Sequence, residues 1–205
     1  HRVDRRQRQM CIRDRGVNTT ADLKGKTLGV WFYGNEYPFL SWMSRLGLKT
    51  DGSANGVTVL RQGWGVEPLT EGQAACVSTM SYNEYWVVRD AGYSPEQLTV
   101  FKYQSEGAAT LEDGLYVHEK NLSDAAFKDK MVRFVRASMK GWKYAEANPK
   151  EAAMIILDND DAGVQTEKHQ VRMMGEIAKL TAGSDGSLDP ADYELSLIHI
   201  SEPTR

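Results

Sequence analysis

Hydrophobic and polar positions along residues 22–103 predict strands and helices in alternation. Short apolar runs, typical of buried strands, are separated by segments with the three- and four-residue apolar spacing of helices. The predicted strands are 27–32, 57–60, 74–79 and 98–103, and the predicted helices are 38–46, a short one between 65 and 72, and 81–91. Asn35 and Ser81 are the expected caps of the first and third helices. Alternating strands and helices favour βαβ units, so we expect an α/β fold with a mainly parallel sheet.

The pattern changes after a short predicted strand at 115–117, and from Ser123 onward it is helical. One predicted helix runs to about residue 147, and its apolar face is lined by Phe127, Met131, Phe134, Val135, Ser138 and Trp142. Asn148 and Pro149 begin a second helix, with Glu151 at the capping-box position. A third is expected from about 166 to 180. The simplest interpretation of these apolar faces is that they lie in the core.

Both ends of the chain look foreign to the protein. Residues 10–15 (MCIRDR) and 195–200 (LSLIHI) can be encoded by inverted copies of one transposon end that is used in sequencing-library adapters. The residues around them, 5–9 and 201–205, fit the adapter arms. We therefore expect residues 1–15 and 195–205 to be adapter-derived and exclude them from fold reasoning. The native chain would then be an interior fragment of a longer protein.

Excluding the ends changes the charge and the cysteine count. The whole chain carries a net charge of −3, whereas residues 16–194 hold 18 Lys and Arg against 25 Asp and Glu, a net charge of −7. Such an acidic segment is a poor candidate for binding nucleic acid. Only Cys76 remains, so no internal disulfide and no thiol metal site are expected. No run of 18 apolar residues occurs, so we expect no membrane-spanning segment.

Two polar and aromatic segments follow predicted strands and form the candidate site. Trp31 lies at the end of the first predicted strand, and Asn35, Glu36 and Tyr37 follow it. Tyr82, Asn83, Glu84 and Tyr85 come after the third strand. The carboxyl ends of parallel strands, next to helix N-termini, are where open α/β proteins bind small molecules. An ordinary turn without a ligand is the alternative for the first segment. For the second, the alternative is a half-buried helix with Tyr85 and Trp86 in the core.

Several segments carry a resemblance to a known family. Residues 25–40 and 79–86, together with TLEDGLYV at 110–117 and FVRASMKGW at 134–142, resemble the substrate-binding components of ABC transporters. Among these, the chain is most similar to the branch that binds thiamine-pyrimidine precursors, within a broader family of sulfonate, taurine and nitrate binders. The similarity covers essentially all of residues 16–194.

The resemblance implies a two-lobed periplasmic-binding-protein fold of type II, with mainly parallel sheets and flanking helices. Residues 16–105 would be the second α/β lobe, and residues 106–194 the crossover and helical return to the first lobe, whose N-terminal half is missing here. The implied protein is a monomer that works with an ABC permease. It would be periplasmic or lipid-anchored outside the cytoplasm, and no catalytic residue, metal or cofactor is expected.

The residue types in the two segments favour an aminopyrimidine as the ligand. A sulfonate or nitrate would meet the carboxylates of these two segments, which contain no Lys or Arg. A flat aminopyrimidine would instead find aromatic faces to stack on and amide and carboxylate groups to hydrogen-bond. The expected ligand-binding residues are Trp31, Asn35, Glu36, Tyr37, Tyr82, Asn83, Tyr85 and Glu112. Glu112 is included because of its position in the family, at the crossover between the lobes. Asp113 is expected to be only a solvated turn residue.

Three alternatives to this interpretation stay open. The same fold is shared by an enzyme that makes the thiamine pyrimidine from a histidine and pyridoxal phosphate. Its reactive Lys and His would lie in the missing lobe, and its cysteine-rich cluster is absent here. A binder of a sulfonate, taurine or nitrate is the second alternative, and a sensor lobe fused to a signalling domain is the third. His118 and His169 fit no metal-binding motif, and no nucleophile-elbow or P-loop pattern occurs.

Overall fold

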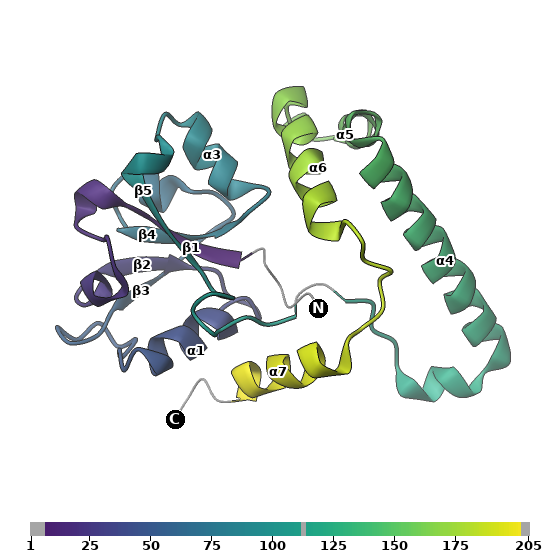
Figure 1. Cartoon of the computed structure of the whole chain (residues 1–205), viewed down its shortest axis with the longest axis horizontal. Coiled ribbons are helices and arrows are strands. Elements are labelled where there is room, and N and C mark those ends of the chain that lie inside the picture. The colour runs from purple at the N-terminus through teal and green to yellow at the C-terminus, as the bar shows by residue number, and fades with distance from the viewer. Residues whose placement is uncertain (1–6, 112–113, 202–205) are drawn as a thin grey trace. The chain divides into compact units, whose positions relative to one another are not determined.

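A computed structural model describes residues 7–111 and 114–201, and these form two compact units (Figure 1). The first unit comprises His1–Glu112 and Asp189–Arg205, and the second comprises Asp113–Leu188. The first contains the sheet and the candidate site, and the second is helical. The lobe boundary that we expect between residues 105 and 106 stays a prediction.

A five-stranded mixed sheet organises the first unit. Its strands are β1 (Gln7–Ile12), β2 (Thr27–Val30), β3 (Thr58–Arg61), β4 (Cys76–Met80) and β5 (Leu98–Lys102), in the spatial order β3-β2-β4-β1-β5. β2 pairs in parallel with both β3 and β4, whereas β1 runs antiparallel between β4 and β5. Four of the five strands therefore point the same way. The predicted α/β class with a mainly parallel sheet is confirmed.

Helices cover both faces of this sheet. The helices of the unit are α1 (Tyr37–Arg45), α2 (Glu67–Thr70), α3 (Glu84–Asp90) and α7 (Pro190–Ser201), with short 3₁₀ turns at Arg13–Arg15, Thr20–Leu23 and Pro95–Gln97. On the α1 face, Trp42 is fully buried and its ring lies 5.3 Å from that of Phe101 and 5.7 Å from that of Tyr103. On the other face, Leu69 of α2 and Val88 of α3 pack with Val77 of β4. Burial of large side chains on both faces is the main stabilising term of this layer arrangement.

Strand β1 lies within the segment that the sequence interpretation excluded. Met10 and Cys11 are fully buried, and the strand fills the sheet position between β4 and β5. Excluding this segment from the fold was wrong, because residues 7–12 form hydrogen-bonded ladders with both β4 and β5 whatever their coding origin. The origin itself stays a prediction, as does that of residues 195–205.

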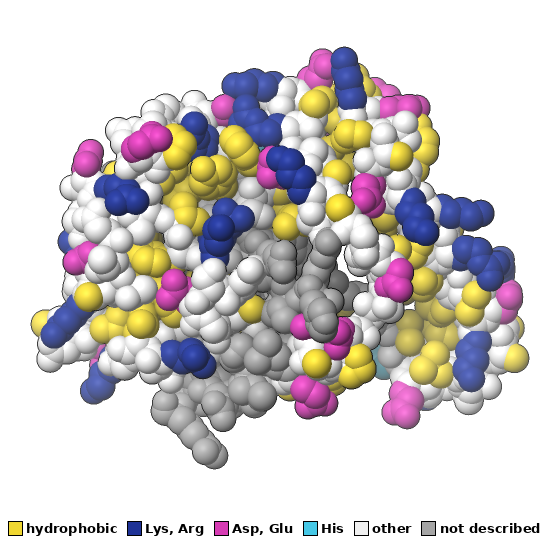
Figure 2. Space-filling model, in the orientation of Figure 1, with side chains coloured by type: hydrophobic (Ala, Val, Ile, Leu, Met, Phe, Trp, Pro, Cys, Tyr) yellow, Lys and Arg dark blue, Asp and Glu magenta, His cyan; other side chains and the backbone are white. Residues whose placement is uncertain are grey.

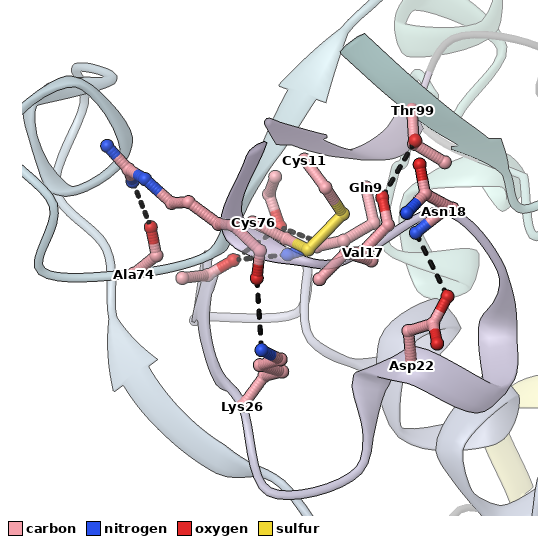
Figure 3. Close-up of a disulfide and its surroundings, with 12 residues drawn as sticks. Gln9, Cys11, Val17, Asn18, Asp22, Lys26, Ala74, Cys76 and Thr99 are labelled. Carbon is pink, nitrogen blue, oxygen red and sulfur yellow. Dashed lines mark hydrogen bonds between the residues drawn. A yellow bond between two sulfur atoms is a disulfide. The ribbon is translucent and has the colours of Figure 1, made fainter. Parts of the chain in front are cut away.

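The expectation that the chain has no internal disulfide was also wrong. Cys11 of β1 and Cys76 of β4 are directly opposite each other in the antiparallel register, and their sulfurs are bonded (Figure 3). Side chains directly opposite on neighbouring strands lie on the same face, which brings the two sulfurs together. Counting Cys76 alone missed the bond because its partner had been removed with the first fifteen residues.

The second unit is a three-helix layer with a small core. It is formed by α4 (Ala125–Ala147), α5 (Pro149–Asp158) and α6 (Glu167–Thr181), preceded by a 3₁₀ turn at Glu119–Ser123. α5 packs on α6, where Ala153 and Met174 are buried. The interpretation of the α4 face as core was wrong for this chain: Phe134 and Trp142 are 52% and 50% exposed. Within the second unit, the small core between α5 and α6 leaves these side chains uncovered. Hydrophobic side chains are visible on the surface in Figure 2.

Several local predictions were wrong at the ends of elements. Residues 115–117 form no strand, and their side chains are exposed. The residue at the N-cap of α1 is Glu36 rather than Asn35, and that of α3 is Asn83 rather than Ser81. Asn148 caps α5 by position but makes no side-chain cap bond, so the expected capping box with Glu151 does not form. Thr166 does cap α6, because its Oγ1 accepts a hydrogen bond from the His169 N–H at 3.3 Å.

Candidate functional site

The candidate site lies at the carboxyl edge of the parallel strands. From β2 the chain passes through α1 to β3 on one side, and it then returns through α2 to β4 on the other side of β2. β2 and β4 are therefore neighbours at the point where the strand order reverses. A crevice outside the strand ends at such a reversal is the usual ligand position in open α/β sheets.

The structure brings both predicted segments to this edge. The residues after β2 are Trp31, Asn35, Glu36 and Tyr37, and those after β4 are Tyr82, Asn83 and Tyr85. The β2–β4 pairing of Leu28 with Cys76 sets the two segments on adjacent strands. Glu112 and Asp113 lie outside the described residues. A ligand-binding role for any of these side chains stays a prediction.

Local hydrogen bonds shape the β2–α1 loop. The Trp31 Nε1–H donates to the Gly63 carbonyl oxygen at 2.9 Å, which ties this loop to the one that follows β3. The Glu36 Oε2 accepts from the Gly34 N–H at 2.7 Å, and the Asn35 Nδ2 donates to the Phe32 carbonyl oxygen at 3.3 Å. One carboxylate oxygen and one amide donor are thus engaged inside the turn. Each still has a further polar atom that can face a ligand.

Arg61 adjoins the same loop, and the sequence interpretation missed it. Arg61 ends β3 and is paired with Val30, the last residue of β2. Its guanidinium carbon lies 4.6 Å from the centroid of the Tyr33 ring and 5.7 Å from that of Phe32, and Nη2 donates to the Tyr33 hydroxyl. Lys and Arg are absent only from the segments after the first and third predicted strands, and Arg61 lies at the end of the second. The parallel register of β3 brings a cation to the edge.

The β4–α3 loop is organised by Glu84. Its Oε2 accepts from the Met80 N–H at 2.8 Å, and its Oε1 accepts from the Asn83 Nδ2 at 2.8 Å. Burial raises the pKa of the Glu84 carboxyl above its ordinary value, while the hydrogen bonds from Met80 and Asn83 partly oppose that rise. Since both carboxylate oxygens already accept hydrogen bonds, Glu84 supports the loop.

The aromatic residues after β4 are divided between loop and core. Tyr85 packs against the buried cluster on the α3 face, and its ring meets that of Trp86 edge-on at 5.2 Å. This packing matches the core alternative for Tyr85. Tyr82 and Asn83 precede α3 and are half-buried in the loop itself.

A buried polar network lies directly beneath the edge. The Gln62 Nε2 donates to the carbonyl oxygens of Ser78 and Gly65, each at 3.0 Å, and the Gln62 Oε1 accepts from the Ser78 N–H at 2.9 Å. One side chain therefore bonds to the backbone of β4 and to the loop after β3. Buried, satisfied amide pairs of this kind fix strand ends in one arrangement. No periodic pattern points to Gln62, because its role depends on the β3-β2-β4 order.

Two buried hydroxyl groups at the end of β4 have no hydrogen-bond partner among the described residues. They are the Thr79 Oγ1 and the Ser81 Oγ, in side chains that are 0% and 8% exposed. Buried hydroxyls without partners are uncommon, because each leaves an uncompensated desolvation cost. They mark the β4 end as a place where hydrogen-bonding capacity is unused.

Other kinds of site find no support in the part of the chain that is described. Residues 7–111 and 114–201 contain no group of three or more His, Cys, Asp or Glu side chains placed to hold a metal ion. Within the same ranges, no helix is long and apolar enough to cross a bilayer.

Comparison with known proteins identifies the family. No curated protein matches the chain. Several solved structures are similar, among them one from work on the molecular and structural basis of glutathione import in Gram-positive bacteria via GshT and the cystine ABC importer TcyBC of Streptococcus mutans. The similarity has a TM-score of 0.42 and 12% identity, and it covers 71% of this chain and 59% of that one. The model of the family described as NMT1/THI5 like matches residues 5–152. Since that match spans well over half of the sequence, the chain belongs to the NMT1/THI5-like family.

Proposed function

We propose that this chain is part of the solute-binding component of an ABC importer, which captures a thiamine-type aminopyrimidine and delivers it to a permease. The observation that carries the proposal is the joining of two aromatic and amide-rich loops at the β2–β4 strand reversal. Membership of the NMT1/THI5-like family supports a role with this class of ligand. The proposed role is binding rather than catalysis, and the proposed location is periplasmic or lipid-anchored outside the cytoplasm.

The chemistry of the edge suits a flat, hydrogen-bonding ring. Trp31, Tyr37 and Tyr82 offer aromatic surface for stacking, and the amide groups of Asn35 and Asn83 can donate to or accept from ring nitrogens and an exocyclic amine. The carboxylates of Glu36 and Glu84 already bond within their loops. We propose Glu112, because of its position in the family, as the carboxylate that accepts from the exocyclic amine.

The proposed mechanism is closure of two lobes around the ligand. Residues 16–105 would form the second lobe, and residues 106–194 would cross over and return to the first. The exposed apolar face of α4, including Phe134 and Trp142, supports this organisation, because such a face needs a covering layer. Ligand binding would stabilise the closed state because only that state contacts the ligand from both sides.

Calorimetric titration of the complete protein tests the proposed function. An aminopyrimidine of the thiamine type, or its formylated relative, should bind more tightly than taurine, a larger sulfonate or nitrate. The comparison controls for nonspecific anion binding, because the competing ligands carry no aromatic ring. Tight binding of taurine or nitrate with no response to the pyrimidine would contradict the proposal.

A further inference from the structure

Tyr33 and Arg61 form an exposed pair at the carboxyl ends of β2 and β3. Neither residue belongs to the proposed pyrimidine contacts. The pair arises from the strand register, because Arg61 is opposite Val30 and the chain after Val30 leads directly to Tyr33. The guanidinium lies over the Tyr33 ring at 4.6 Å and donates a hydrogen bond to its hydroxyl. Two contacts therefore orient one cation above one ring.

The backbone at Tyr33 suggests that its position is functional. Its φ is 63°, and no other non-glycine residue among those described has a positive φ. The left-handed region is unfavourable for a side chain with a Cβ atom, and such conformations cluster at functional sites. The ring is 88% exposed, so burial does not offset this cost. What the conformation does achieve is to place the ring beneath Arg61.

Arg61 keeps hydrogen-bonding capacity that the fold does not use. Its side chain is exposed, and it makes no ion pair with any residue in 7–111 or 114–201. A guanidinium has five N–H donors, of which the Tyr33 hydroxyl engages one. Stacking on Tyr33 already restricts the Arg61 side chain, so that side chain loses less conformational entropy when its remaining donors bind a second group.

We propose that Arg61, oriented by Tyr33, binds an anionic substituent on the ligand, so that the preferred solute is an aminopyrimidine carrying a phosphate or carboxylate group. This inference rests on the proposed function. Arg binds carboxylate and phosphate through paired N–H donors, and a flat ring can stack on the neighbouring aromatic side chains. Trp64, in the loop that follows Arg61, is 96% exposed and offers a further aromatic surface in that loop.

A free small anion fits this arrangement less well than a substituted ring. One exposed guanidinium offers a single charge, and the nearby turn also contains the Glu36 carboxylate. The ring would supply most of the contact, and Arg61 would select the substituent. The pair would therefore act on specificity and would add little to the affinity for the unsubstituted base.

The test is calorimetric titration of the complete protein with an aminopyrimidine, its phosphate monoester, its carboxylate derivative and inorganic phosphate. The wild type should bind at least one anionic derivative about tenfold to a hundredfold more tightly than the parent base. The Arg61→Gln variant should lose that preference while its affinity for the parent base changes less than about threefold. Exposed Lys24, before β2 at the opposite edge of the sheet, provides a control. Lys24→Gln removes the same charge and should keep the preference.

The outcomes separate this inference from the proposed function. If the wild type binds the parent base and both anionic derivatives equally, the Arg61 inference is overturned and the proposed function stands. If none of the pyrimidines binds, the proposed function fails as well. If Arg61→Gln retains the preference, or if inorganic phosphate alone binds as tightly as the phosphate ester, Arg61 does not read a substituent on the ring. The phosphate and carboxylate arms identify which anionic group is preferred.

Discussion

Glu84 is the residue whose environment gives the clearest pH dependence. Burial raises the pKa of its carboxyl above the ordinary value of 4.5. The folded state therefore holds this proton more tightly than the unfolded state does. The stability that results is present in full below pH 4.5, and it is lost as the pH rises through the raised pKa.

The Glu84→Gln variant should remove this dependence. We expect the difference in unfolding free energy, wild type minus variant, to decrease as the pH is raised from below 4.5 toward neutrality, measured by chemical denaturation. Asp22→Asn is a control for which the pH dependence of stability should have the opposite sign. Hydrogen bonds from Thr19 lower the pKa of Asp22 from 3.8, so its contribution is lost as the pH falls. A difference for Glu84→Gln that grows with pH would contradict the assignment.

Variants at Tyr33 separate the free-energy cost of its backbone conformation from the contribution of its ring. Tyr33→Gly and Tyr33→Ala both remove the ring, but only glycine adopts a φ of 63° without a steric penalty. We expect Tyr33→Gly to be more stable than Tyr33→Ala by about 1 kcal/mol in thermal or denaturant unfolding. Both should lose the preference for anionic derivatives. Equal stabilities would mean that the loop relaxes and that Tyr33 is not held in place.

At the residue scale, the sequence predicted the loop residues but not their partners. Asn35 and Asn83 were selected because they follow strands with a strong apolar pattern, and Trp31 because it lies at the end of the first of these strands. Arg61 and Gln62 were not found, because their importance depends on which strands are neighbours. Neighbour relations are long-range information that local spacing does not contain.

At the element scale, apolar runs located the strands and missed their ends. The predicted strand 27–32 is shorter in the structure, Thr27–Val30, because Trp31 and Phe32 already belong to the loop. Helix starts were less predictable than helix interiors. Glu84 reaches back to the Met80 N–H, and this bond delays α3 by three residues relative to the predicted start at Ser81. Capping residues chosen by type alone cannot anticipate such competing side chains.

The disulfide that anchors strand β1 leads to a prediction about stability. The Cys11–Cys76 bond closes a loop with a sequence separation of 65 and joins β1 to β4. In the chain-entropy account, a loop of this length stabilises the folded state by about 4 kcal/mol. Reduction should therefore lower the unfolding free energy of this chain by about that amount, measured by denaturant titration with and without reductant.

The control for the disulfide is the Cys76→Ala variant, which has no bond to reduce. Its unfolding should not change when reductant is added. If the wild type is equally insensitive to reductant, β1 is not cross-linked to the sheet. That result would favour the interpretation that residues 1–15 are foreign to the folded protein.

At the scale of the whole molecule, the exposed face of α4 is the feature that most needs a partner layer. Val135 is 44% exposed, and Phe134 and Trp142 are more exposed still. The sequence predicted an apolar face correctly, but periodicity cannot say whether the covering layer is present. We expect Phe134→Ser with Trp142→Ser to reduce self-association of this chain, measured by light scattering.

The same double variant should have the opposite effect in the complete protein. There, the first lobe would cover α4, so losing both side chains should lower the melting temperature. Arg133, exposed beside them and paired with Asp129 at 2.9 Å, provides a control through Arg133→Gln. An unchanged melting temperature for the double variant would show that α4 is a solvent-facing helix in the complete protein as well.

The most direct test of the account is hydrogen–deuterium exchange of the complete protein with and without a saturating aminopyrimidine. We expect slower exchange in peptides that cover residues 31–37 and 80–85, the two loops at the β2–β4 reversal. Peptides that cover residues 13–26, at the opposite edge of the sheet, should change little. If the ligand binds but leaves exchange in both loops unchanged, the site does not lie at this edge and the account is contradicted.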